Sequence, residues 1–101
     1  MFGLSPETIE KIQKVFSKYE NIDKAILYGS RAKGNYQNGS DIDITLIGKD
    51  LTLNNSVYLI EEELEELLLP YTFDISIFAK IDNQELVDHI NRVGKVFYKN
   101  A

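Results

Sequence analysis

The hydrophobic pattern of the first twenty residues predicts an amphipathic helix. Ser5, Pro6 and Glu7 form a typical helix start, because serine caps the first turn, proline fits the first helical position and glutamate lies near the positive end of the dipole. Apolar residues then recur at helical spacing and are expected to face the core: Ile9, Ile12, Val15, Phe16 and Tyr19. Lysines on another side of this segment indicate a solvated face.

Two further segments have the helical spacing. A helix is expected from residue 54 or 55 to residue 69, where Pro70 ends it. Its predicted buried residues are Val57, Ile60, Leu64, Leu67 and Leu68. A last helix begins after Asp82 or Asn83, and Gly94 fits a left-handed position at its end. Its apolar positions include Leu86, Ile90 and Val93.

Strands are predicted in four places: residues 24–28, 41–47, 72–78 and a short edge strand at 96–98. Side chains on a strand alternate between its two faces. In the second strand, Asp41, Asp43 and Thr45 therefore lie opposite Ile42, Ile44 and Leu46. In the third strand, Thr72, Asp74 and Ser76 lie opposite Phe73, Ile75 and Ile77. Each of these strands offers an apolar face for helices and a polar face that carries carboxylate.

This order of elements predicts an α/β (α+β) fold, with a small mixed sheet and helices packed on one face. The first two strands are separated by about a dozen residues, which fits an antiparallel pair better than a full crossover. The chain has 101 residues, so we expect residues 1–101 to form a single domain with one core.

Composition narrows the functional classes. The net charge of −5 argues against direct binding of DNA or RNA, which usually requires a basic face. Cysteine is absent, so disulfides and thiolate metal sites are excluded. The sequence has no apolar run long enough to span a bilayer and no positively charged leader, and we expect a cytoplasmic protein without a membrane partner.

Candidate chemistry is concentrated in residues 28–47. Gly29 and Ser30 close the first strand, and Asp41 and Asp43 open the second. Carboxylates at positions i and i+2 of a strand have Cα atoms roughly 6–7 Å apart, a spacing that can hold Mg²⁺ together with substrate phosphates. If the polar faces of the second and third strands align, Asp74 joins them, and three carboxylates converge on one or two ions.

The turn between the two strands suits a polyphosphate. Gly29 permits a tight turn and a close approach of backbone N–H groups to phosphate oxygens, and Ser30 adds a hydroxyl donor. Arg31 and Lys33 are candidate phosphate contacts in a brief helix that ends near Gly34. Either half of this pattern alone is weak, but their occurrence on consecutive strands, with Asp74 on a matching face, is a strong signal.

Together, Gly29-Ser30 and Asp41-Ile42-Asp43 resemble the signature of the minimal nucleotidyltransferases (MNT) of the DNA polymerase β superfamily. The resemblance covers nearly the whole chain. It implies the polymerase-β-like nucleotidyltransferase fold, a triphosphate bound by Gly29 and Ser30, and two Mg²⁺ ions held by Asp41 and Asp43. It also implies that Asp74 is the third metal-binding, catalytic carboxylate, placed to help activate an acceptor hydroxyl.

Short members of the superfamily are similar to the antitoxin half of a toxin–antitoxin module whose other half is a helical HEPN-domain ribonuclease encoded nearby. The resemblance implies that ATP is the substrate and that AMP is moved to a tyrosine of the HEPN partner. Two alternatives stay open: a non-catalytic protein that inhibits such a partner by occlusion, and a nucleotidyltransferase with a small-molecule acceptor. The single histidine, His89, is expected to be a surface or partly buried residue of the last helix rather than a catalytic one.

Overall fold

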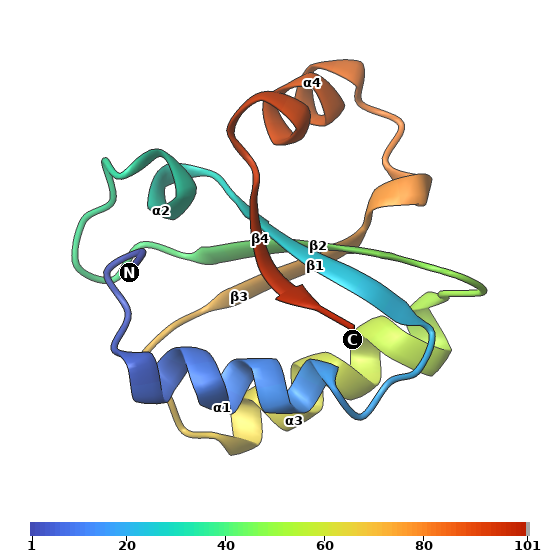
Figure 1. Cartoon of the computed structure of the whole chain (residues 1–101), viewed down its shortest axis with the longest axis horizontal. Helices are drawn as coiled ribbons and strands as arrows, with labels where there is room; N and C mark the ends of the chain where they lie inside the picture. The colour runs from blue at the N-terminus through green and yellow to red at the C-terminus, as the bar shows by residue number, and fades with distance from the viewer. Residues whose placement is uncertain (101) are drawn as a thin grey trace.

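The structure, a computed structural model, describes residues 1–100. In chain order its elements are α1 (Pro6–Phe16), β1 (Ile22–Tyr28), α2 (Ser30–Lys33), β2 (Ile42–Gly48), the π-helical turn η1 (Leu53–Val57), α3 (Tyr58–Glu66), β3 (Phe73–Ile77), the 3-10 turn η2 (Phe78–Lys80), α4 (Gln84–Val93) and β4 (Lys95–Lys99). Figure 1 shows the strands as a central layer, with α1 and α3 below it and α4 above it. Within residues 1–100, no helix is both long and apolar enough to cross a membrane.

The four strands form one mixed sheet in the order β3-β2-β1-β4. β1 pairs antiparallel with both β2 and β4, whereas β2 and β3 are parallel. The predicted mixed sheet and the predicted edge strand are therefore confirmed. The short connection through α2 returns the chain antiparallel beside β1, and the longer segment through α3 brings β3 in parallel to β2.

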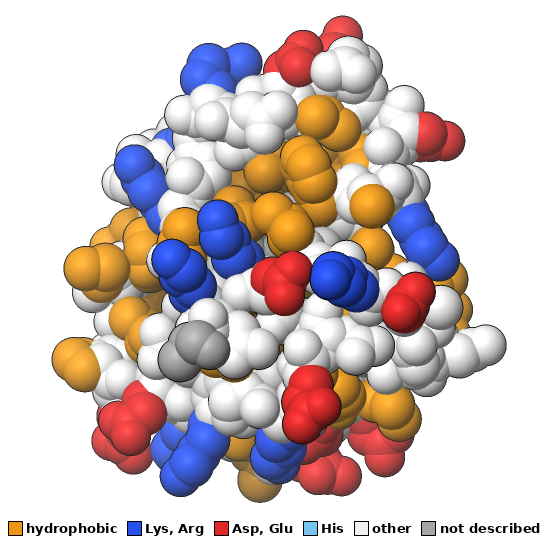
Figure 2. Space-filling model, turned by 45° about the vertical axis from the view of Figure 1, so that its right-hand side comes forward, with side chains coloured by type: hydrophobic (Ala, Val, Ile, Leu, Met, Phe, Trp, Pro, Cys, Tyr) orange, Lys and Arg blue, Asp and Glu red, His pale blue; other side chains and the backbone are white. Residues whose placement is uncertain are grey.

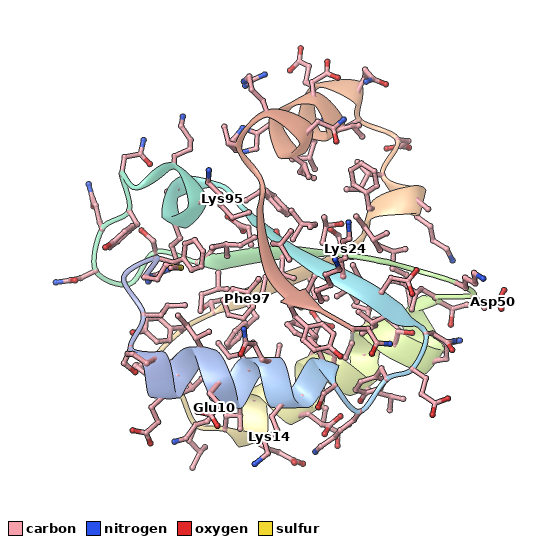
Figure 3. All side chains as sticks on the ribbon, in the orientation of Figure 1. Glu10, Lys14, Lys24, Asp50, Lys95 and Phe97 are labelled. Carbon is pink, nitrogen blue, oxygen red and sulfur yellow. The ribbon has the colours of Figure 1, made fainter. Side chains whose placement is uncertain are left out.

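The main core lies between the sheet and the pair of helices α1 and α3. Ile44 and Leu46 of β2 are fully buried there, as are Ile12 and Phe16 of α1. Figure 3 shows Phe97 of β4 between its strand and α1, and its ring meets that of Phe16 edge-on with centroids 6.5 Å apart. The predicted apolar stripe of α1 and the predicted apolar face of β2 are thus confirmed.

The fourth helix lies on the other side of the sheet, so the prediction that helices pack on one face holds for α1 and α3 but not for α4 (Figure 1). The physical reason is that β1 is apolar on both faces. Ala25 and Leu27 are buried in the main core, whereas Tyr28 lies against α4. Figure 2 shows apolar side chains gathered between α4 and the sheet. Ile90 is the residue of α4 that is buried there.

Helix ends follow the predicted capping chemistry in part. Ser5 Oγ accepts a hydrogen bond from the Thr8 N–H at 3.1 Å, and Asn83 Oδ1 accepts one from the Leu86 N–H at 3.2 Å. The predicted cap at residue 54 or 55 is wrong, because Thr52 caps η1 through a reciprocal pair of bonds with Asn55.

Two other helix ends differ from the prediction. α3 ends at Glu66, short of the expected residue 69, and Leu68 has a left-handed φ of 56°. Gly94 is extended at φ −60° and ψ 144°, rather than left-handed. The reason is that the chain passes directly from α4 into β4 at this point. Close packing requires glycine there instead, since a Cβ would overlap the backbone carbonyl oxygen of Ile90 and would lie 2.7 Å from Ile26 Cγ2.

Candidate active site

The sheet register brings two of the three predicted carboxylates side by side. Asp43 of β2 and Asp74 of β3 are register partners in the parallel pair, so both lie on the same face. Asp41 lies one residue before β2 and two before Asp43, which places it on that face as well. Asp43 is half-buried, and the other two are exposed. The predicted alignment of the polar faces of β2 and β3 is confirmed.

The two neighbouring carboxylates affect the protonation of Asp43. Burial raises the pKa of Asp43 above its ordinary value, and the negative charges of Asp74 and then Asp41 raise it further. Nearby like charges disfavour the ionised form of a carboxyl group, and a bound cation favours it. This acidic face of the sheet therefore favours the binding of a cation.

This donor set fits Mg²⁺. The three side chains offer only carboxylate oxygen, which is the ligand type that a hard divalent cation prefers. Within residues 1–100, no three acidic or histidine side chains stand in a ready-made metal cluster. Mg²⁺ does not require one, because it is commonly held by one or two carboxylates together with substrate phosphates and water.

Gly29 packs directly against this face. Its φ is +76°, a region that other residues rarely adopt, and a Cβ at this position would overlap Oδ2 of Asp43. Tyr28, the preceding residue, is the register partner of Asp43 in the antiparallel pair. The expected tight turn is confirmed, and glycine is required there for two reasons: the backbone conformation and the close approach to Asp43.

The turn leads into α2, where two of the predicted phosphate contacts lie. Ser30 is the first residue of α2 and is partly exposed, and Lys33 is exposed in the same short helix. α2 ends at Gly34 as expected, and Gly34 is in the left-handed conformation at φ 88°. Ser30 and Lys33 are therefore open to a ligand at this end of β1.

Arg31 has a different place from the one that the sequence suggests. It is only 3% exposed. Its Nε and Nη2 donate to the carbonyl oxygen of Ser40 at 3.1 and 3.0 Å, and its Nη1 donates to that of Phe2 at 2.9 Å. The guanidinium also lies over the rings of Tyr36 and Tyr71, with centroids at 5.3 and 4.9 Å. All three guanidinium nitrogens therefore donate to backbone carbonyls, and the two bonds to Ser40 hold the loop that leads to Asp41 in place.

His89 reaches the turn from α4, although sequence reasoning assigned it no part in the site. The Gly29 N–H donates to His89 Nε2 at 3.2 Å, so this amide is occupied rather than free for a phosphate oxygen. His89 is half-buried, within the expected range of a surface or partly buried residue. A signal was present in the sequence: His89 follows Leu86 by three residues and precedes Val93 by four, which places it on the inward face of α4.

Tyr28 completes this side of the site. Its ring meets the His89 imidazole at 80° with centroids 6.2 Å apart. Burial raises the pKa of the Tyr28 hydroxyl, and the carboxylates of Asp74 and Asp43 raise it further. The phenol therefore stays protonated beside the acidic face.

Comparison with known proteins agrees with this geometry. The profile of the family described as Polymerase beta, Nucleotidyltransferase matches residues 10–101. MJ0604 of Methanocaldococcus jannaschii, which is named provisionally as a protein adenylyltransferase, is 34% identical over 93 residues, or 91% of this chain and 84% of that protein. MJ0141 of the same organism, which carries the same provisional name, is 27% identical over 92 residues, covering 87% of this chain and 93% of that protein.

Solved structures share the fold. A chain in the structure of a toxin–antitoxin with AMP-PNP superimposes with a TM-score of 0.73 and 21% identity, covering 96% of this chain and 75% of that one. A chain in the structure of a tri-AMPylated HEPN toxin in complex with MNT antitoxin, from Shewanella oneidensis, gives 0.68 and 19%, with coverage of 93% and 71%. The expected nucleotidyltransferase fold and enzyme class are confirmed, and the chain belongs to the polymerase beta nucleotidyltransferase family.

Proposed function

We propose that this protein transfers AMP from ATP to a tyrosine hydroxyl of a HEPN-domain ribonuclease encoded near its gene, and so acts as the antitoxin of that partner in the cytoplasm. One observation carries the proposal. Asp43 is in register with Asp74 on one face of the sheet and lies against the Gly29 turn, so the acidic side chains are directly adjacent to the glycine turn that leads into Ser30. The family membership supports the same reaction class.

The proposed reaction assigns each group a role. Asp41 and Asp43 hold Mg²⁺, Ser30 contacts the triphosphate, and Asp74 lies nearest the acceptor. When bound, Mg²⁺ neutralises the phosphates and favours the ionised form of the attacking hydroxyl. The acceptor oxygen forms a bond to the α-phosphorus, the bond from the α-phosphorus to the bridging oxygen breaks, and pyrophosphate leaves. Asp74 accepts the hydroxyl proton directly or through water.

The relatives support a protein acceptor. The names of MJ0604 and MJ0141 describe protein adenylyltransferases, and the Shewanella oneidensis structure contains a tri-AMPylated HEPN toxin with its MNT antitoxin. Exposed apolar side chains also favour a docked partner here. Leu53, Tyr58 and Leu59 are 48%, 53% and 46% exposed along η1 and the start of α3.

The test is label transfer from α-labelled ATP, with Mg²⁺, to the product of the neighbouring HEPN gene. Asp43→Asn is the informative variant, because it removes the charge but keeps the shape of the side chain. Asp82→Asn is the matched control, since Asp82 is exposed and lies outside the site. We expect wild type and Asp82→Asn to label the partner and Asp43→Asn to fail. Equal labelling by Asp43→Asn would contradict the proposal.

Inhibition by binding alone is the second candidate, and the exposed apolar side chains of η1 and α3 favour it as well. A variant that lacks all three carboxylates distinguishes the two functions. If that variant silences the ribonuclease as well as wild type, occlusion accounts for inhibition. If it still binds the partner but no longer silences it, transfer accounts for inhibition.

A further inference from the structure

The hydrogen bond between His89 and Gly29 joins two elements that are distant in the sequence. The Gly29 N–H donates to Nε2 of the imidazole, 60 residues away, at 3.2 Å. In this geometry Nε2 is the hydrogen-bond acceptor, as in the imidazole tautomer that carries its hydrogen on Nδ1. α4 is thereby fastened to the turn beside Asp43.

The imidazole is held in place by packing against buried neighbours. The Tyr28 ring packs edge-on against it, and Tyr28 is itself 7% exposed. One residue further along α4, Ile90 is buried, and Gly94 packs against Ile26 where the helix ends. Side chains that are locked in this way can fix the position of a neighbouring group to within fractions of an ångström.

Gly29 needs such a fixed partner. Glycine has access to more backbone conformations than any other residue, so its peptide is easily reoriented unless something holds it. The backbone here is at φ 76° and ψ −156° and lies in contact with the Asp43 carboxylate. A rotation of this peptide would move Ser30 relative to Asp43, the two residues that we assign to the triphosphate and to the metal.

We infer that His89 is a positioning residue for nucleotide binding, which acts through the Gly29 amide. This inference rests on the proposed function. The imidazole does not contact the nucleotide. It fixes the Gly29 peptide so that Ser30 presents its donors to the triphosphate at a set distance from the metal-binding carboxylates.

Two substitutions separate the hydrogen bond from the ring packing. His89→Phe keeps an aromatic ring against Tyr28 but cannot accept a hydrogen bond, whereas His89→Gln keeps an acceptor and loses the ring. Asn91→Ala is the surface control on the same helix, since Asn91 is exposed. The measurements are kcat and KM for ATP in the transfer reaction, and the unfolding midpoint of each variant.

We expect His89→Phe to raise the KM for ATP about tenfold, the effect typical of one lost hydrogen bond, with a smaller change in kcat. His89→Gln is expected to restore most of the loss, and Asn91→Ala to match wild type. A residue with a merely structural role would lower the unfolding midpoint and leave KM unchanged. A wild-type KM in His89→Phe, or a KM in His89→Gln as high as that in His89→Phe, would overturn the inference.

A second readout does not depend on activity. In nitrogen-15 NMR spectra without nucleotide, the His89 ring of wild type is expected to show an unprotonated Nε2. The Gly29 amide is expected to exchange slowly in wild type and His89→Gln and at least several-fold faster in His89→Phe. Equal exchange in wild type and His89→Phe would overturn the inference. If wild type transfers no AMP, the proposed function fails, and the exchange measurement still decides whether His89 holds Gly29.

Discussion

The two faces of strand β2 differ in what they contribute to the molecule. On the face toward α1 and α3, Ile42, Ile44 and Leu46 are all fully buried. On the opposite face, Asp43 is half-buried beside Asp74 and its pKa is raised by burial and by that neighbouring carboxylate. Adjacent residues of β2 therefore have opposite effects: the apolar side chains on one face stabilise the fold, and the ionised Asp43 on the other face destabilises it.

Thr45, which is fully buried on the same face as Asp43, is a second polar residue whose burial is unfavourable. It follows Asp43 by two residues, and its Oγ1 has no hydrogen-bond partner among residues 1–100. A buried hydroxyl without a partner costs stability, whereas the isoleucines that alternate with it gain stability from burial. We conclude that the α1–α3 face supplies the stability that allows a crowded, polar arrangement on the other face.

The largest expected effect on stability comes from the α1–α3 face. Ile44→Ala is expected to lower the free energy of unfolding by about 2–5 kcal/mol, because a cavity forms in the main core. Ile44→Val is the control and is expected to cost about 0.5–1.5 kcal/mol. Urea unfolding measures both. Equal losses for the two variants would show that this side of β2 is not tightly packed.

A substitution in the Gly29 turn tests the packing on the face of the sheet that carries Asp43. Gly29→Ala is expected to lower the free energy of unfolding by about 1–3 kcal/mol and to abolish transfer, because its φ is +76° and the new Cβ would overlap Asp43. Gly39→Ala is the matched control: its φ is +84°, but a Cβ there would meet nothing within 4 Å. Both variants carry the backbone strain, and only the first disturbs Asp43. If Gly39→Ala loses as much transfer as Gly29→Ala, contact with Asp43 is not what requires glycine at position 29.

Arg31 lies next to the candidate site but hydrogen-bonds to backbone carbonyls. The Arg31→Lys variant tests whether its role is to stabilise the fold or to bind phosphate. Lysine has one terminal nitrogen and cannot reproduce the three hydrogen bonds that the guanidinium makes to Ser40 and Phe2, so we expect a loss of about 1–3 kcal/mol in the free energy of unfolding. Lys33→Ala, at an exposed position of the same helix, is expected to leave stability nearly unchanged. A higher KM for ATP with unchanged stability in Arg31→Lys would instead indicate that Arg31 contacts phosphate.

The smallest expected effect on stability is a gain. Asp43→Asn is expected to raise the unfolding midpoint at pH 7, because it removes a charge that burial and Asp74 disfavour. The raised pKa means that the unfolded chain loses this proton first as pH rises. The native state of wild type therefore loses stability between the unfolded pKa and the folded pKa of Asp43.

Thermal unfolding from pH 3 to pH 7 without metal measures this effect as a gap between the two proteins that widens with pH. Asp82→Asn, at an exposed position, controls for the general effect of one less charge. A midpoint for Asp43→Asn below that of wild type at pH 7 would contradict the expected strain on this face.

Much of the fold could be predicted because the responsible signals are local. Alternation in β2 and β3 assigned their faces and predicted that Asp74 joins Asp43 if the polar faces of the two strands align, which the register confirms. The position of α4 was missed, although Ile26 and Tyr28 make the second face of β1 apolar and require a cover.

The neighbours of the site residues were harder to predict. The partners of Arg31 are backbone carbonyls of Phe2 and Ser40, and every residue has a carbonyl, so the sequence does not distinguish them. The bond from Gly29 to His89 depends on how α4 crosses β1, which is a tertiary feature. The helical spacing could assign His89 to the inner face of α4, but not to a particular amide.

The most direct test of the central claim combines function and stability in one variant. The intact mass of the HEPN partner is measured after incubation with ATP, Mg²⁺ and either wild type or Asp43→Asn, alongside the unfolding midpoint of each enzyme. We predict that the partner gains the mass of AMP only with wild type, while Asp43→Asn is at least as stable. A partner that gains AMP with a well-folded Asp43→Asn would contradict the assignment of this face as the transfer site.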